Sequence, residues 1–217
     1  MTQKLAGTIA ILIIIAIALP MIIRTVIWRR FLKYMKEDKN EQALKILNSS
    51  YYRLLFGSYS QKWNLLRYYI SRNDTDQVKR RTTTLLTEKF DPNESYQLFS
   101  NAFFYFMTIK DKEMCTKLIN RMDDIADSEQ KEYFHMLYRV MIEEKSQDIK
   151  AVTKLIEKKE REKESNSKTS QLGMLQYLLG IQYHYKGNDK EAEKWLRKAL
   201  NNVKGSPLEK EIKKIIH

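Results

Sequence analysis

The sequence contains few of the residues that interrupt helices, and it is almost devoid of cysteine. Its 217 residues include six glycines, three prolines and one cysteine. The scarcity of glycine and proline, together with the lack of an alternating apolar pattern, predicts an all-α fold. The single Cys115 excludes an internal disulfide and a zinc site built from several thiolates. It fits a reducing compartment, and we expect it to be a small buried residue between helices.

Motifs that carry catalysis are also missing. The chain has no glycine-rich phosphate loop, no nucleophile elbow and no histidine pair at metal-ligand spacing. His135, His184 and His217 are far apart in the sequence, and we expect His184 to be exposed or to face a groove. The acidic stretch MDDIADSE (122–129) is expected to cap helices rather than to bind a metal. These absences predict a protein that is not an enzyme and that uses no cofactor, metal or small-molecule ligand.

One long uncharged run contrasts with the rest of this charged chain. Residues 5–23, LAGTIAILIIIAIALPMII, would span roughly 28 Å as a helix, close to the thickness of the hydrocarbon core of a bilayer. A cleaved secretory signal and a buried core helix are the alternatives, but no small-residue cleavage pattern follows the run. The run therefore predicts a transmembrane anchor over residues 1–28.

Basic residues are much more frequent after this run than before it. Lys4 alone precedes it, whereas Arg24, Arg29, Arg30, Lys33 and Lys36 follow it closely. Such an excess is typical of the cytoplasmic side, so the sequence predicts a single-pass cell-membrane protein with its N-terminus outside and its remaining domain in the cytoplasm. These juxtamembrane residues are also expected to contact anionic lipid, at about 1 kcal/mol for each basic residue near the surface.

Positive charge and aromatic residues are concentrated together in the first part of the chain. Residues 1–88 contain 15 basic and 6 acidic residues, against 24 and 21 in the remainder. One aromatic group lies between Tyr51 and Tyr69 and a second between Phe99 and Phe106, and some of these side chains are expected to line a concave binding surface. Nucleic acid is disfavoured as a partner by the predicted membrane tether, and an acidic protein segment fits better. The candidate partner-binding cations are Arg53, Lys62, Arg67, Arg72, Lys79, Arg80 and Arg81.

Polar turns recur at a nearly constant spacing. They are EDKNE (37–41), RNDTD (72–76), IKDKE (109–113), KSQDI (145–149) and KGNDK (186–190). Each turn is followed by a small or short apolar residue, and nine positions before that residue stands a bulky one. The small residues are Ala43, Val78, Cys115, Ala151 and Ala192, and the bulky ones are Tyr34, Tyr69, Phe106, Ile142 and Tyr183. This alternation is typical of stacked helical hairpins, in which a large side chain fills the space beside a small one.

The turns divide the chain into expected helices. The expected pairs are 24–36 with 40–55, 59–72 with 75–88, 92–109 with 111–124, 128–144 with 148–163, and 169–186 with 189–203, followed by a closing helix over 207–216. The stretch 158–170 is expected to be a charged helix end that runs into a loop.

The last hairpin resembles a tetratricopeptide repeat. The matching positions are Leu179, Gly180, Tyr183, Ala192, Leu196 and Ala199, with Gly187 at the turn. Two positions depart from the pattern, because Gln176 replaces the expected tryptophan and Lys204 the closing proline. The resemblance implies that residues 29–217 form an α-solenoid of about five degenerate helix pairs, a fold that binds protein segments.

Together these features predict a membrane-anchored scaffold or adaptor. It would bind a protein or peptide segment, and thereby assemble or regulate a complex at the membrane. The alternative is an envelope assembly protein or chaperone with its repeat domain on the extracytoplasmic side.

Overall fold

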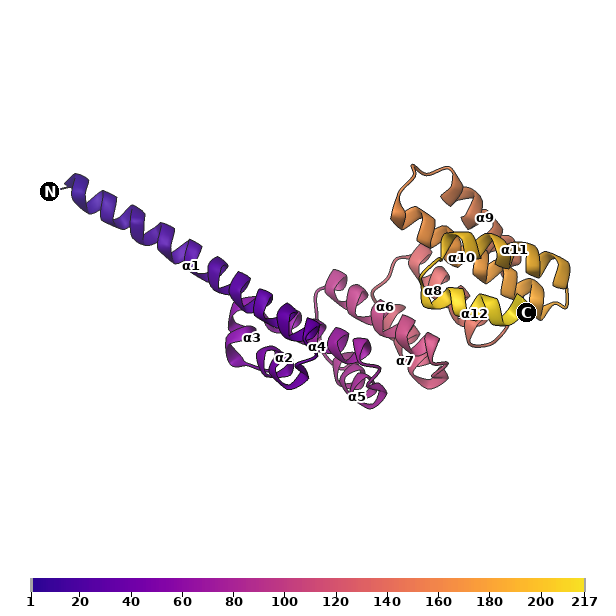
Figure 1. Cartoon of the computed structure of the whole chain (residues 1–217), viewed down its shortest axis with the longest axis horizontal. Coiled ribbons are helices and arrows are strands. Elements are labelled where there is room, and N and C mark those ends of the chain that lie inside the picture. Colours follow the sequence, from indigo (N-terminus) through magenta and orange to yellow (C-terminus); the bar gives the residue numbers. More distant parts are fainter. Residues whose placement is uncertain (1, 217) are drawn as a thin grey trace. The chain divides into compact units, whose positions relative to one another are not determined.

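The computed structural model describes the backbone of residues 2–216 and the side chains of residue 13, residues 15–206 and residues 208–216. In this part of the chain every regular element is an α-helix (Figure 1), which confirms the predicted all-α class. The chain forms two compact units, Met1–Leu98 and Phe99–His217. Their boundary lies inside one helix.

The first unit consists of helical hairpins that follow one another along the chain. Its helices are α1 (Thr2–Lys36), α2 (Asn40–Leu47), α3 (Ser50–Phe56), α4 (Ser58–Ser71), α5 (Thr75–Leu86) and the beginning of α6 (Pro92–Thr108). The prediction of one helix over 40–55 is wrong, because α2 ends at Leu47 and a new helix begins at Ser50. The Ser49 hydroxyl accepts a hydrogen bond from the N–H of Tyr52 and so caps α3, and Gly57, with φ of 87°, separates α3 from α4.

Helix α1 is a single helix of 35 residues (Figure 1). Its C-terminal part packs against α2 and α3, where Phe31 is buried. Before this part, large apolar side chains are exposed at Ile13, Ile15, Ile17, Leu19, Met21, Ile22, Ile23 and Val26. Residues 5–12 and 14 of the predicted span lie outside the described side chains. Among the residues whose side chains the structure describes, no helix is long and apolar enough to cross a membrane.

The second unit is organised around one central helix. It contains the end of α6, and then α7 (Lys112–Met122), α8 (Ser128–Met141), α9 (Ile149–Glu160), α10 (Asn166–Tyr185), α11 (Asp189–Asn202) and α12 (Pro207–Ile216). Helix α10 contacts α8, α9 and α11, and all its residues from 175 to 182 are buried. Helix α12 packs on α11 and closes the unit, as expected for 207–216.

Four hairpin turns have the same backbone geometry. Each contains one residue with positive φ, namely Asp38, Asn73, Lys110 or Gly187, at 51° to 70°. The next residue donates its N–H to the carbonyl five positions earlier, at 2.9 to 3.1 Å, and the accepting carbonyls belong to Tyr34, Tyr69, Phe106 and Tyr183. This is the hydrogen bond of a Schellman motif. Because the donating residue also begins the following helix, the turn fixes the register between the bulky residue before it and the small residue after it.

The hairpin between α8 and α9 has a different turn. Its α9 cap, Asp148, is buried and accepts two hydrogen bonds from the Arg139 guanidinium, at 2.7 and 2.9 Å. The main-chain N–H of Asp148 donates to the side-chain oxygen of Gln182 on α10 at 3.0 Å. The sequence predicts Ala151 at the crossing of the two helices of this hairpin, and this prediction is wrong by one position. Ala151 is exposed, and Val152, four residues after the cap, is fully buried.

The charged connection between α9 and α10 is held by a buried lysine. The Lys168 ammonium donates to the carbonyls of Glu160 and Glu162, at 3.0 and 2.7 Å, and to the Glu164 carboxylate. These carbonyls are at and just beyond the C-terminal end of α9, where a cation is favourable. The single lysine thus ties the end of α9 to the first turn of α10.

Candidate partner-binding surface

A row of three side chains runs along one face of α4. Tyr59, Trp63 and Arg67 are four residues apart, which is the spacing of neighbours on one helix face. The rings of Tyr59 and Trp63 are stacked with centroids 6.4 Å apart, and the Arg67 guanidinium carbon lies 5.6 Å from the Trp63 ring. Both aromatic residues are half-buried, whereas Arg67 is exposed. The row therefore presents aromatic surface that ends in a cation.

The loop after α5 and the start of α6 extend this row. The Phe90 ring meets the edge of Tyr59 at 6.0 Å, and the Tyr59 hydroxyl donates to the side-chain oxygen of Gln97 at 3.3 Å. Lys62 forms an ion pair with Glu88 and lies 5.4 Å from the Phe90 ring. Burial, and then the charge of Glu94, raise the pKa of Tyr59, so its hydroxyl is a neutral donor at physiological pH. We call Tyr59, Lys62, Trp63, Arg67 and Phe90 the α4 surface.

The seven cations expected to bind a partner are distributed over α3, α4 with the turn after it, and α5. Lys62 and Arg67 belong to the α4 surface, Arg53 is on α3, and Lys79 and Arg80 are on α5. Arg72 forms an ion pair of 2.8 Å with Asp38, and Arg81 lies 4.7 Å from the Tyr69 ring. These two arginines connect elements of the first unit to each other. Phe90, which was not expected from the sequence, lies beside Tyr59 and Lys62 and adds an aromatic ring to this region.

The second aromatic group is mostly core. Phe99, Phe103 and Phe106 are fully buried, whereas Phe104 is 37% exposed. Phe104 lines a groove of about 420 Å³ together with Tyr133, Leu155 and Leu175. The Lys158 ammonium and the Glu129 carboxylate, 2.8 Å apart, form an ion pair across this groove. Lys159 and Glu162 also line the groove and form an ion pair of 2.8 Å, so all four of its charges are paired, in contrast to Arg67 on the α4 surface.

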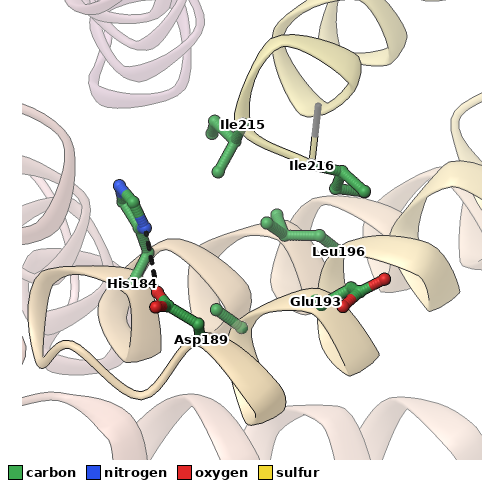
Figure 2. A pocket seen from close by; sticks show the side chains of 7 residues that line it. His184, Asp189, Glu193, Leu196, Ile215 and Ile216 are labelled. Carbon is green, nitrogen blue, oxygen red and sulfur yellow. Dashed lines mark ion pairs between the residues drawn. The ribbon is translucent and has the colours of Figure 1, made fainter.

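Figure 2 shows a smaller pocket of about 150 Å³ in the second unit. Ile215 and Ile216 of α12 face Leu196 and Glu193 of α11, and a nitrogen of His184 lies 3.9 Å from the Asp189 carboxylate. The pocket is too small for a folded peptide. His184 is exposed and lines it, which agrees with the expectation from the sequence.

The acidic stretch 122–129 serves helix capping. The Asp127 side chain accepts from the N–H of Gln130, and the Gln130 side chain accepts from the N–H of Asp127, which makes a capping box at the start of α8. The Asp123 carboxylate lies 2.9 Å from a ring nitrogen of His135. Among the described residues no three metal-binding side chains converge.

Most of the residues expected at the helix crossings are buried. In the last hairpin Leu179, Gly180, Ala192, Leu196 and Ala199 are buried between α10 and α11, and Tyr183 is half-buried before the turn. Gln176, at the position of the missing tryptophan, is buried and accepts a hydrogen bond of 2.8 Å from Asn202. In the earlier hairpins Ala43, Tyr69, Val78, Phe106 and Cys115 are buried, and Tyr34 is half-buried.

Comparison with known proteins gives no relative from which a function could be transferred. No protein-family model matches the chain, and no curated protein or solved structure matches it significantly. A function therefore has to be argued from the residues themselves.

Proposed function

We propose that the protein is a membrane-anchored adaptor that binds an acidic protein segment on the α4 surface. In this account α1 carries a transmembrane anchor, with the N-terminus outside and the helical hairpins in the cytoplasm. The hairpins form a degenerate solenoid of the tetratricopeptide kind, and binding brings the partner to the membrane.

The membrane part of the proposal is supported by α1. The uncharged run 5–23 has the length of a span, and the side chains from Ile13 to Val26 that are described include many exposed apolar ones. Large exposed apolar surfaces mark contact with lipid or with another protein. Arg24, Arg29 and Arg30 follow directly, which favours the cytoplasmic side for the remainder of the chain.

One observation supports the binding part most directly, namely the row formed by Tyr59, Trp63 and Arg67. Tryptophan, tyrosine and arginine are the residues that dominate binding energy at protein interfaces. An apolar side chain of the partner would lie on the half-buried rings, and a carboxylate would pair with the Arg67 guanidinium. Arg67 suits this role because the described residues offer it no carboxylate within ion-pair distance.

The repeated turn supports the solenoid. Four turns with the same positive-φ residue and the same hydrogen bond give each of these hairpins the same register between its two helices. Stacked helix pairs of one register expose their first helices side by side, and such surfaces bind extended or helical segments. Helices α4 and α6 are first helices of this kind, and Tyr59 and Gln97 already join them.

The proposal is tested by crosslinking the full-length protein in intact membranes and identifying what is captured. The double variant Trp63→Ala/Arg67→Glu should lose the partner, whereas Trp195→Ala/Lys198→Glu should keep it. The second pair is a matched control, because the Lys198 ammonium lies 4.4 Å from the Trp195 ring on α11. The circular dichroism spectrum should be the same for both variants.

Salt provides a second criterion for this experiment. Charges at the rim of an interface are screened over about 8 to 10 Å at physiological ionic strength, so capture should weaken as salt is raised. Undiminished capture by the α4 variant, equal loss with the α11 control, or capture of RNA that nuclease removes would each contradict the proposal.

A further inference from the structure

A groove lies between α1 and α2 at the point where α1 joins the domain. It has a volume of about 470 Å³, and Ile27, Arg30 and Tyr34 of α1 line one wall. The other wall is formed by Gln42, Lys45 and Ile46 of α2, with Ser49 and Tyr51 at one end. The three α1 residues are three, four and seven positions apart and therefore share one face of their helix, and on α2 Gln42 is three positions from Lys45 and four from Ile46.

The charges in this groove all have one sign. Arg30 and Lys45 are exposed cations, and no acidic residue is among the described residues that line the groove. Neither cation has a carboxylate within ion-pair distance in the described part of the chain, unlike Lys33 nearby, which lies 3.8 Å from Glu37. The Gln42 amide and the hydroxyls of the two tyrosines add uncharged donors. Such a set suits a phosphate group.

The groove also has a polarity gradient along its length. Helices α1 and α2 are antiparallel and joined by the turn at Asp38, so Tyr34 and Gln42 lie at the end near the turn. Ile27, Ile46 and Tyr51 lie at the opposite end, toward the exposed apolar part of α1. Helix α3 continues this end with two outward side chains, because Tyr51 is 73% exposed and Leu54 81% exposed. Tyrosine is enriched at membrane interfaces.

The height of Arg30 above the apolar run agrees with the headgroup region. Seven residues separate it from Ile23, a rise of about 10 Å along a helix. Helical side chains lean toward the N-terminus of their helix, and long basic side chains extend toward the membrane interface. The polar layer on each side of a bilayer is roughly 5 to 8 Å thick. The guanidinium thus reaches the level at which lipid phosphates lie.

We propose that this groove binds the headgroup phosphate of one anionic phospholipid between Arg30 and Lys45, with the acyl chains running along the apolar part of α1. The inference rests on the membrane anchor of the proposed function. It goes further in that it assigns a bound lipid to a defined groove, whereas a diffuse basic cluster would attract any anionic surface. A bound lipid would hold α2 and α3 close to the membrane.

The test uses the full-length protein in phosphatidylcholine vesicles, with a fluorophore attached through Leu54→Cys. Cys115 does not compete for the label, because it is fully buried. Quenching is measured with brominated phosphatidylglycerol or brominated phosphatidylcholine at increasing mole fraction. We expect phosphatidylglycerol to reach half-maximal quenching at a mole fraction about thirtyfold lower than phosphatidylcholine does. This ratio corresponds to two cations that each contribute about 1 kcal/mol.

Two double variants that each remove two positive charges distinguish lipid binding in the groove from a general attraction to anionic lipid. Arg30→Gln/Lys45→Gln should abolish the preference for the anionic lipid, whereas Lys33→Gln/Lys36→Gln should reduce it by less than tenfold. Inorganic phosphate should leave the quenching unchanged, since the site is completed by the acyl chains. The proposed lipid site would be overturned if both variants lost the lipid preference equally or if the natural protein showed no preference. Displacement of the lipid by inorganic phosphate would also overturn it.

Flotation after alkaline carbonate treatment distinguishes this failure from that of the anchor. A protein that stays with the vesicles but shows no lipid preference retains its anchor and lacks the groove. A protein that carbonate releases has no membrane-spanning anchor, and then both proposals are overturned.

Discussion

A Cβ atom added to Gly180 would lie only 2.7 Å from Cγ of Leu196 and 3.1 Å from its main-chain nitrogen. Helices α10 and α11 therefore touch at this glycine. We predict that Gly180→Ala destabilises the protein, because overpacking costs about 1 to 3 kcal/mol and exceeds the gain of up to about 1 kcal/mol in helix propensity. Urea unfolding of the full-length protein in mild detergent, followed by circular dichroism, measures the effect.

An exposed position on the same helix provides the control for this substitution. Ser170→Ala should change the free energy of unfolding by no more than about 0.5 kcal/mol. If Gly180→Ala were neutral or stabilising, α10 and α11 would not meet at Gly180, and the packing of the last hairpin would have to be revised.

The register of the hairpins is tested by introducing tryptophan at two alanines. Ala192→Trp places a large ring at a 3% exposed position between α10 and α11 and should cost on the order of 1 to 3 kcal/mol or more. Ala151→Trp should cost about 0.5 kcal/mol or less, because Ala151 is exposed and Val152 occupies the crossing. Thermal unfolding of both variants provides the comparison, and a larger loss for Ala151→Trp would restore the register expected from the sequence.

Most helices could be predicted because their ends are encoded locally. Asp111 and Asp127 cap the helices that follow them, and Pro92 begins α6. The break between α2 and α3 was missed because the Ser49 cap lies within an otherwise continuous helical pattern. In the hairpin between α8 and α9 the predicted crossing residue was wrong by one position. There Asp148 is held by Arg139 and by Gln182, a residue of a later helix, and sequence spacing alone does not reveal such a contact.

The candidate surface could be predicted only in part. The spacing of Tyr59, Trp63 and Arg67 is readable from the sequence, since residues four apart share a helix face. The contact of Phe90 with Tyr59 and the ion pair of Arg72 could not be foreseen. Both depend on contacts between distant residues, such as the pair of Arg72 with Asp38, 34 positions away.

Alkaline pH should destabilise the protein through Cys115. Burial raises the pKa of this thiol from 9.0 to about 12, so the unfolded chain loses the thiol proton first. Between pH 9 and 12 the folded state binds more protons than the unfolded state, and stability falls as the pH rises. At pH 10 this single group should contribute a loss of about 1 kcal/mol.

Cys115→Ala isolates this contribution. The free energy of unfolding is measured for both proteins at pH 7.5 and pH 10, and the difference between the two pH values should be smaller for the variant by about that amount. An identical difference for both proteins would mean that the thiol is not buried in the folded state.

The proposed orientation in the membrane rests on the basic residues after the apolar run. Protease added to intact cells should leave residues 40–217 undigested, because this part is expected in the cytoplasm. Permeabilised cells should allow digestion and serve as the control. Digestion of the domain in intact cells would place it on the outer side and favour the alternative of an envelope assembly protein or chaperone.

Site-specific photocrosslinking tests whether the α4 surface binds a protein at the membrane, as we propose. A photoreactive amino acid replaces Trp63 in one full-length protein and Trp195 in another, and both are irradiated in intact membranes. We expect a discrete protein adduct from position 63 that weakens with salt and is absent from position 195. An adduct from position 195 alone, or no protein adduct from position 63, would contradict it.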